Sequence, residues 1–141
     1  MILDANILLY AVDSSSRHHL QAVEWVGESL AGDVRVGFPI QTLTAFARIA
    51  SHPRVMSSPL VATDVTRLVD AWLAAPGAWV PQAGPATWGA ARSLFDATGA
   101  VGNLVPDLML AALALEHGVA VVSADTDFGR FSQIRWINPV A

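Results

Sequence analysis

The stretch VAVVSADTDF, residues 119–128, decides the fold class of this chain. Its first five residues form an apolar run with three valines, which is typical of a central strand buried on both faces of a parallel sheet. Asp125 and Asp127 follow directly, at the point where such a strand ends. Ligands of open α/β sheets bind at the carboxyl ends of the strands. The stretch therefore predicts both a parallel sheet and the edge at which a site would lie.

The rest of the chain alternates short apolar runs with longer helical segments, a pattern that predicts a parallel α/β fold. Strands are expected at residues 1–4, 34–37, 78–80, 119–123 and 134–137. Helices are expected at residues 17–30, 39–50, 58–75, 86–97 and 104–117, with a short helical turn at 126–131 and a further helix entered after the first strand. Ser14-Ser15-Ser16 and Ser58-Pro59 are expected to start two of these helices, because serine caps helix N-termini and proline suits the first turn.

Length and composition indicate one compact domain spanning residues 1–141. Hydrophobic residues make up 53% and charged residues 14% of the chain, which excludes disorder along its whole length. No apolar run approaches the roughly 20 residues of a membrane span, and the start Met-Ile-Leu-Asp does not read as a signal or an anchor. We therefore expect a cytoplasmic protein without a membrane segment.

Two residue types are absent, and their absence removes whole classes of chemistry. The chain has no cysteine, which excludes disulfides, thiolate zinc sites and cysteine nucleophiles. It has no lysine, which excludes Schiff-base chemistry and Walker-type phosphate loops. The formal net charge is −4, so binding of a nucleic acid would require local arginines or bound cations.

Four aspartates from three distant segments are predicted to meet at the carboxyl edge of the sheet. Asp4 follows the first strand, Asp107 lies in the first turn of the helix at 104–117, and Asp125 and Asp127 follow the strand at 119–123. Each alone could be an ordinary cap or turn residue. Together they would repel one another unless a divalent cation bound there, and oxygen-rich sites suit Mg²⁺ or Mn²⁺.

Three motifs at these separations resemble a known family. They are Asp4-Ala5-Asn6, then Asn103 with Pro106-Asp107 opening an Ala/Leu-rich helix, then Ser123-Ala124-Asp125-Thr126-Asp127-Phe128. The set resembles the PIN-domain ribonucleases and, more closely, the VapC toxins of bacterial toxin–antitoxin pairs. The resemblance implies a three-layer α/β/α sandwich with a central parallel sheet. It also implies metal-dependent endonucleolytic cleavage of RNA, a VapB-type antitoxin as partner, and a homodimer.

The same resemblance assigns roles by position. Asp4, Asp107 and Asp125 match the metal-binding acids of the family, and Asp127 matches an auxiliary fourth acid. Asn6 matches the polar residue that supports the first aspartate. The chemistry agrees with these roles, because phosphodiester hydrolysis needs an activated water and neutralised phosphorane charge, and a metal supplies both.

One position departs from the family pattern. The family places a glutamate on the helix after the second strand, and the corresponding segment here reads Leu43-Thr44-Ala45-Phe46, so Ala45 stands in its place. The helix at 39–50 contains no acid, and Gln41, one turn earlier, offers only a neutral oxygen. Ala45 is either an engineered Glu→Ala change or a natural one. In both cases the chain as written is expected to bind metal less well and to cleave slowly or not at all.

Two arginines are candidates for contact with the RNA backbone. Arg48 lies three residues after Ala45 and therefore shares its helix face. Arg54 follows His52-Pro53 at the end of the same segment. With no lysine in the chain, arginine also carries all of the ordinary positive charge of the surface.

A second function remains open, and two others are excluded. The missing glutamate also fits a catalytically silent PIN-fold module that binds an antitoxin or RNA. A receiver-like phosphoacceptor shares strand-end aspartates, but its chemistry needs a lysine. A phosphatase of the haloacid dehalogenase type needs that lysine too, and a second aspartate where this chain has Asn6.

Overall fold

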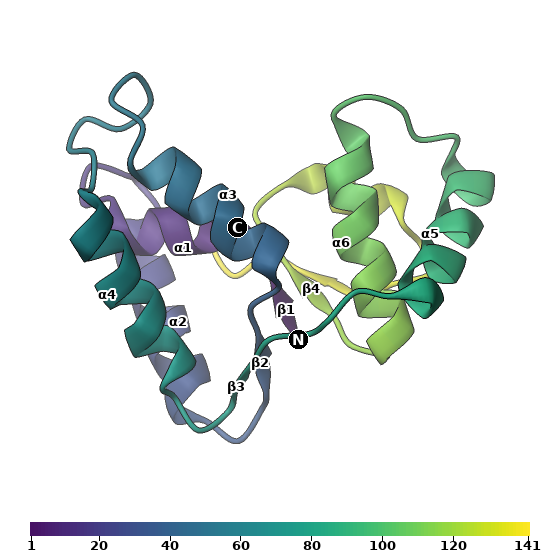
Figure 1. Cartoon of the computed structure of the whole chain (residues 1–141), viewed down its shortest axis with the longest axis horizontal. Coiled ribbons are helices and arrows are strands. Elements are labelled where there is room, and N and C mark those ends of the chain that lie inside the picture. The colour runs from purple at the N-terminus through teal and green to yellow at the C-terminus, as the bar shows by residue number, and fades with distance from the viewer.

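A computed structural model describes residues 1–141, and its centre is one parallel sheet of five strands (Figure 1). The strand order is β3-β2-β1-β4-β5, and every neighbouring pair is parallel. The predicted parallel sheet is therefore confirmed, with each strand confined to two residues of the expected run. The strands are β1 (Ile2–Leu3), β2 (Val36–Gly37), β3 (Ala78–Trp79), β4 (Val121–Val122) and β5 (Trp136–Ile137).

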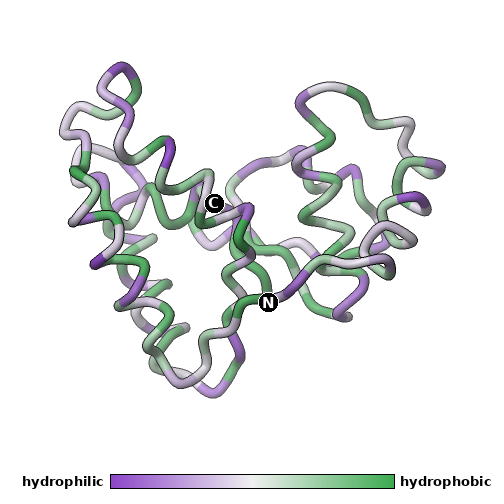
Figure 2. Tube along the Cα trace, in the orientation of Figure 1, coloured by the Kyte–Doolittle hydropathy of each residue, from purple (hydrophilic) through white to green (hydrophobic).

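Helices cover both faces of the sheet, which confirms the three-layer α/β/α sandwich. Successive strand residues point to opposite faces, so Leu3 and Val122 belong to one apolar core and Ile2 and Val121 to the other. The first core packs against α1 to α4 and the second against α5 and α6, and the central strands are strongly hydrophobic (Figures 1 and 2). The helices are α1 (Ala5–Val12), α2 (His19–Ala31), α3 (Ile40–Ala50), α4 (Ala62–Leu73), α5 (Pro85–Thr98) and α6 (Leu104–His117), and a 3-10 helix, η1, spans Thr126–Arg130.

The strand order creates a switch point between β1 and β4. From β1 the chain proceeds through β2 to β3 on one side, whereas β4 and β5 lie on the other side. The backbone N–H of Asp4 donates to the carbonyl of Val122 at 2.9 Å, which ties the ends of the two central strands together. Crevices at such switch points are the usual ligand sites of open α/β sheets.

The predicted serine cap of α2 is wrong. The helix begins at His19, with His18 as a cap residue that makes no side-chain hydrogen bond. The serines instead belong to a turn after α1, in which the carboxylate of Asp13 accepts from both the backbone and the hydroxyl of Ser15, at 3.0 and 2.6 Å. Because Asp13 takes up this turn, α2 starts two residues later than expected.

The predicted start of α4 at Ser58-Pro59 is also wrong, since the helix begins at Ala62 after the extended residue Val61. The backbone N–H of Leu60 donates to the carbonyl of Ala50, the last residue of α3, at 2.8 Å. That long-range bond holds the segment extended and delays the helix.

The helix that carries Asp107 is predicted correctly at both ends. α6 spans Leu104–His117 and ends at Gly118, whose φ of 65° lies in the left-handed region that glycine adopts without strain. None of the helices combines the length and the apolar composition needed to cross a membrane.

Candidate metal centre

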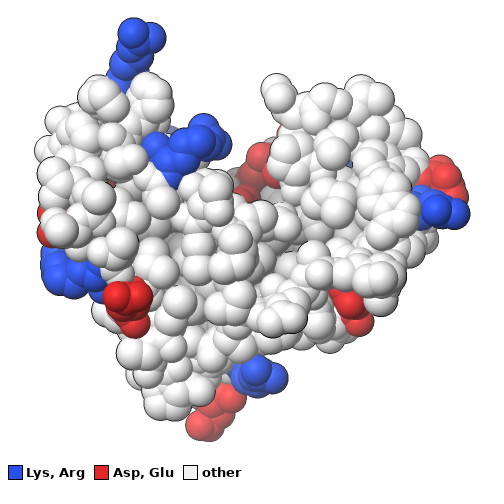
Figure 3. Space-filling view, in the orientation of Figure 1, with Lys and Arg blue, Asp and Glu red and all other residues white.

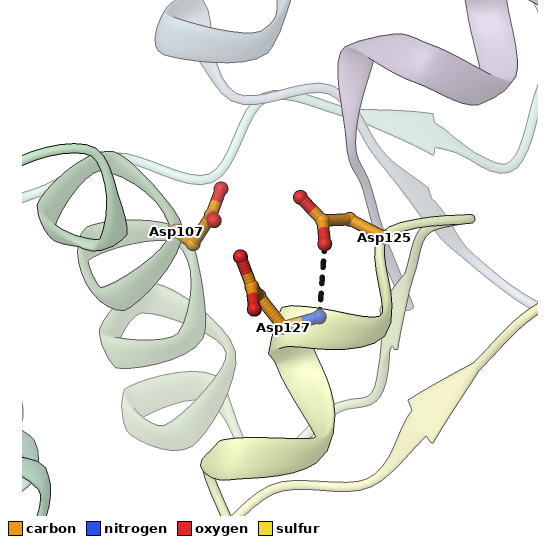
Figure 4. A group of neighbouring side chains, drawn as sticks. All are labelled: Asp107, Asp125 and Asp127. Carbon is orange, nitrogen blue, oxygen red and sulfur yellow. Dashed lines mark hydrogen bonds between the residues drawn. The ribbon is translucent and has the colours of Figure 1, made fainter.

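Three of the predicted aspartates meet at the switch point and form what we call the aspartate group: Asp107, Asp125 and Asp127 (Figure 4). One carboxylate oxygen from each lies within 4.8 Å of those of the other two. Asp107 comes from the first turn of α6, and the other two come from the start of η1. Asp125 caps η1, because its Oδ1 accepts from the backbone N–H of Asp127 at 2.8 Å. This bond fixes the two acids of η1 relative to each other.

Asp4 lies next to the aspartate group, close enough for its charge to raise the pKa of Asp107, and its carboxylate is held by hydrogen bonds. Its Oδ1 accepts from the backbone N–H of Ala5 at 2.7 Å, which caps α1. Its Oδ2 accepts from the hydroxyl of Ser123 at 2.7 Å and from the amide of Asn6 at 3.1 Å. The structure therefore places the expected auxiliary acid, Asp127, in the tightest group and Asp4 next to that group.

Ser123 connects Asp4 to Asp125, a role that the sequence analysis missed. Its hydroxyl donates to Asp4 and accepts from the Asn6 amide at 2.9 Å and from the backbone N–H of Asp125 at 3.0 Å. The Ser123 side chain is fully buried. The sequence does contain a sign of this role, because Ser123 is the one hydroxyl residue at the end of an otherwise apolar strand. A buried hydroxyl group needs hydrogen-bond partners. Asn6 completes the network by accepting from the backbone N–H of Ala124 at 3.2 Å.

The carboxylates destabilise one another electrostatically. Burial, and after it the nearby charges of Asp125, Asp4 and Asp127 in that order of effect, together raise the pKa of Asp107 to about 6. Burial also raises the pKa of Asp4, against the hydrogen bonds from Ser123 and Ala5, which lower it. An acid whose charged form is disfavoured by its neighbours is a favourable place for a cation.

One member of the aspartate group has a cationic partner that the sequence analysis did not identify. Arg130, in the last turn of η1, lies 3.4 Å from the carboxylate of Asp127. The side chains are 65% and 46% exposed, so this ion pair contributes little free energy. Asp107 and Asp125 have no arginine or histidine within ion-pair distance. Arg130 therefore offsets only part of the electrostatic repulsion among the three carboxylates of the aspartate group.

Ala45 faces the carboxylates across a small pocket, which we call the α3–α6 pocket. Its volume is about 100 Å³, and it lies between helix α3 and the start of helix α6. Figure 3 shows the molecule hollowed between these two helices, with acidic side chains in the hollow and basic side chains on the rim over α3. The lining residues are Asp4, Gln41, Thr42, Ala45, Pro106, Asp107 and Leu110. A longer side chain at position 45 would thus point toward Asp4 and Asp107.

The two arginines predicted to contact RNA have different positions. Arg48 is exposed in the last turn of α3, three residues beyond Ala45 and hence on the face that borders the α3–α6 pocket. Arg54 is exposed in the turn after α3, where its backbone N–H donates to His52. No contact links Arg54 to the aspartate group.

Comparison with known proteins shows which family this chain belongs to. Residues 1–134 match the PIN domain. "Ribonuclease VapC37" of Mycobacterium tuberculosis is 44% identical over 142 aligned residues, which cover 99% of this chain and 97% of that protein. The chain belongs to the PIN-domain family. Its PIN domain is also 36% identical to "Ribonuclease VapC33" of the same organism, over 99% of this chain and 98% of the relative. The curated relatives of this PIN domain are thus VapC ribonucleases.

Solved structures share the PIN fold at low sequence identity. VapBC-1 from nontypeable Haemophilus influenzae matches with a TM-score of 0.67 at 15% identity, over 99% of this chain and 98% of that one. DNA-bound VapBC from Salmonella typhimurium matches with a TM-score of 0.66 at 20% identity, over 98% and 96%. These likenesses support the fold assignment.

The donor set of this PIN domain fits a divalent cation. PIN-domain ribonucleases are generally dependent on a divalent metal, and the aspartate group supplies three carboxylate oxygens in mutual reach. Carboxylates are the ligands that Mg²⁺ and Mn²⁺ prefer, and the site contains no sulfur or imidazole ligand that would favour a softer metal.

Proposed function

We propose that this chain is a VapC-type endoribonuclease toxin that hydrolyses RNA with Mg²⁺ or Mn²⁺ bound at Asp107, Asp125 and Asp127, and that it acts in the cytoplasm. The observation that carries the proposal is the aspartate group at the switch point, with the pKa of Asp107 raised to about 6 by burial and by the surrounding carboxylates. The 44% identity to a VapC ribonuclease along the whole chain supports the same reaction.

The cation would supply a water of lowered pKa and would neutralise charge on the phosphorane. The residues of the chain position the reactants. Asp125 is fixed by its bond to the backbone of Asp127, and Ser123 ties it to Asp4. Asp4 borders the α3–α6 pocket beside Asp107 and adds negative charge that favours cation binding. Arg48, exposed beside the pocket, is placed to contact an RNA phosphate.

The chain as written is expected to have weak activity because Ala45 leaves the α3 side of the pocket without a carboxylate. The neighbouring Gln41 lines the same pocket and offers only a neutral amide oxygen. A glutamate at position 45 would add a negative charge that attracts the cation from the side opposite Asp125.

The direct test is Ala45→Glu, assayed for cleavage of total RNA in Mg²⁺ and in EDTA. We expect a gain of at least about 10-fold in Mg²⁺-dependent cleavage, because even residues that only hydrogen-bond to metal ligands change activity by that factor. The matched control is Thr44→Glu, which adds the same charge to α3 at an exposed residue that borders α4 instead of the pocket.

Equal activity in the two variants would contradict the role of position 45 and would favour the alternative, a catalytically silent PIN module that binds an antitoxin or RNA. Loss of activity in both variants, with normal folding, would favour the same alternative.

We also propose a small VapB-type antitoxin as partner, because two of the solved structures that share this fold are VapBC proteins. The homodimer stays a prediction. Co-expression with the protein encoded by a short adjacent gene, followed by co-purification, tests the antitoxin directly.

A further inference from the structure

A second pocket, larger than the α3–α6 pocket, lies beside the metal centre, and the proposed hydrolysis of RNA assigns it no role. Its volume is about 610 Å³, enough for a nucleotide, and we call it the α1–α2 pocket. It is lined by Tyr10 near the end of α1, by residues around the start of α2, and by residues that follow β4 and β5, namely Arg17, His18, Gln21, Ala124 and Asn138.

The α1–α2 pocket shares the carboxyl edge of the sheet with the aspartate group. Ala124 and Asn138 follow the ends of β4 and β5, and all five strands are parallel, so both residues lie at the edge where Asp125 lies. Ala124 directly precedes Asp125, which places their Cα atoms about 3.8 Å apart. A polymer bound at the aspartate group could therefore extend into this pocket.

The side chains of the pocket favour a negatively charged ligand. Arg17 is exposed and has no carboxylate within ion-pair distance, whereas Arg67 and Arg130 each pair with an aspartate. Its Nε donates to Nε2 of His18 at 3.2 Å, which orients the guanidinium and leaves its terminal nitrogens free to donate to a phosphate. None of the lining side chains is acidic.

The other lining groups suit a nucleobase. The rings of Tyr10 and His18 lie 4.9 Å apart and tilted by 50°, forming an aromatic wall on which a base can stack. The side-chain amides of Gln21 and Asn138 can each donate and accept hydrogen bonds, as an exposed base edge requires. The cation suits the phosphate of a single nucleotide, and the aromatic wall and the two amides suit its base.

We propose that the α1–α2 pocket binds one nucleotide of single-stranded RNA next to the phosphate that is cleaved at the aspartate group. This proposal rests on the proposed function for the identity of the substrate. Arg17 contacts the phosphate of that nucleotide, and Tyr10 with His18 stacks on its base. The pocket thereby supplies RNA affinity that the acidic centre, in a chain of net charge −4, lacks.

The test measures RNA binding, not cleavage. A fluorescein-labelled eight-nucleotide oligouridylate is titrated with the full chain in Mg²⁺ and followed by fluorescence anisotropy, with the integrity of the probe checked on a gel. The variants are Arg17→Gln and Gln21→Glu, which alter exposed side chains of the pocket and leave the aspartate group intact. Arg92→Gln, which removes the same charge from an exposed residue of α5, is the matched control.

We expect each pocket variant to raise the dissociation constant about 5- to 10-fold and Arg92→Gln to leave it within about two-fold. Arg17→Gln should also lower the slope of log affinity against log salt by about 0.7, the value for one phosphate contact with a single strand. Thermal unfolding of each variant confirms that it is folded.

Unchanged RNA affinity in both pocket variants would overturn the proposal, as would an absence of binding by the wild-type chain. If the same variants weakened binding of a co-purified protein partner and not of RNA, the pocket would be a protein contact and the proposal would again be wrong. The proposed function would fail separately, through lack of cleavage by Ala45→Glu, so the two failures are distinguishable.

Discussion

The two sides of the α3–α6 pocket differ in how completely they are built. On the side of β1 and η1, the carboxylates of Asp4 and Asp125 are oriented by backbone N–H groups and by the buried hydroxyl of Ser123. On the side of α3, the pocket meets the methyl group of Ala45 and the neutral amide of Gln41. The comparison indicates a metal centre that is organised on one side and lacks a ligand on the other.

The largest effect is expected from removing a carboxylate on the organised side. Asp125→Asn should lower the affinity for Mn²⁺ by about 100-fold or more. The change removes a metal ligand itself, and loss of a residue that only supports a ligand already lowers metal affinity by about 10- to 100-fold. Isothermal titration with MnCl₂ measures the change. Asp96→Asn, which alters an exposed acid of α5, is the control and should bind Mn²⁺ as the unmodified chain does. Equal losses in the two variants would mean that net charge, and not the site, attracts the ion.

Ser123→Ala tests whether the organised side depends on its buried hydroxyl. The change leaves the backbone N–H of Asp125 without its acceptor and removes one of the three donors to Asp4, so the free energy of unfolding should fall by about 1–3 kcal/mol. Mn²⁺ affinity should fall about 10-fold. Urea denaturation and calorimetry measure the two effects. Ser93→Ala, at an exposed serine of α5, should change neither.

The raised pKa of Asp107 predicts a pH dependence of stability in the metal-free protein. The pKa of Asp107 in the folded chain is about 6, against an ordinary value of 3.8, so the folded chain binds more protons than the unfolded chain between these two pH values. The free energy of unfolding should therefore fall as pH rises from about 4 to about 6, and Asp4, whose pKa is also raised, contributes in the same direction. Urea denaturation in EDTA across this range measures the slope.

Asp107→Asn should remove most of that slope, and Asp96→Asn should keep it. Added Mn²⁺ should restore the stability lost near pH 7, since a ligand that binds only the folded chain stabilises it. A stability that rises between pH 4 and pH 6, and equally in Asp107→Asn, would contradict the proposed repulsion.

The smallest effect is expected from Arg130, which competes with a cation for Asp127. Arg130→Gln should raise Mn²⁺ affinity by about 2- to 5-fold, in line with the small energy of an exposed ion pair. Arg67→Gln breaks a comparable exposed pair with Asp64, at 3.2 Å on α4, and should leave Mn²⁺ affinity unchanged. A fall in affinity on loss of Arg130 would show that this arginine supports the site.

Features set by local chemistry were predictable from the sequence. Gly118 ends α6 where expected, because its left-handed backbone stops the helix. The helix also begins at the expected residue, Leu104, so Asp107 lies in its first turn. Apolar runs likewise marked all five strands. The convergence of Asp107, Asp125 and Asp127 followed from a general rule, namely that parallel strands end at one edge of their sheet.

Features set by long-range contacts were not predictable. Ser58-Pro59 has the local pattern of a helix start, yet the bond from Leu60 to Ala50 keeps the segment extended. The pairing of Ser123 with Asp4 joins residues 119 positions apart, and no local pattern encodes it. That bond helps to hold Asp4 beside the aspartate group, where it lines the same pocket as Asp107.

A crystal structure of the chain soaked in MnCl₂, with anomalous scattering from manganese, would show whether the aspartate group binds a divalent cation. We expect one anomalous peak at the switch point, bonded to carboxylate oxygens of Asp107, Asp125 and Asp127, with open space on the side of Ala45. An absence of manganese there, with the three carboxylates apart from one another or joined only to arginines, would contradict this expectation.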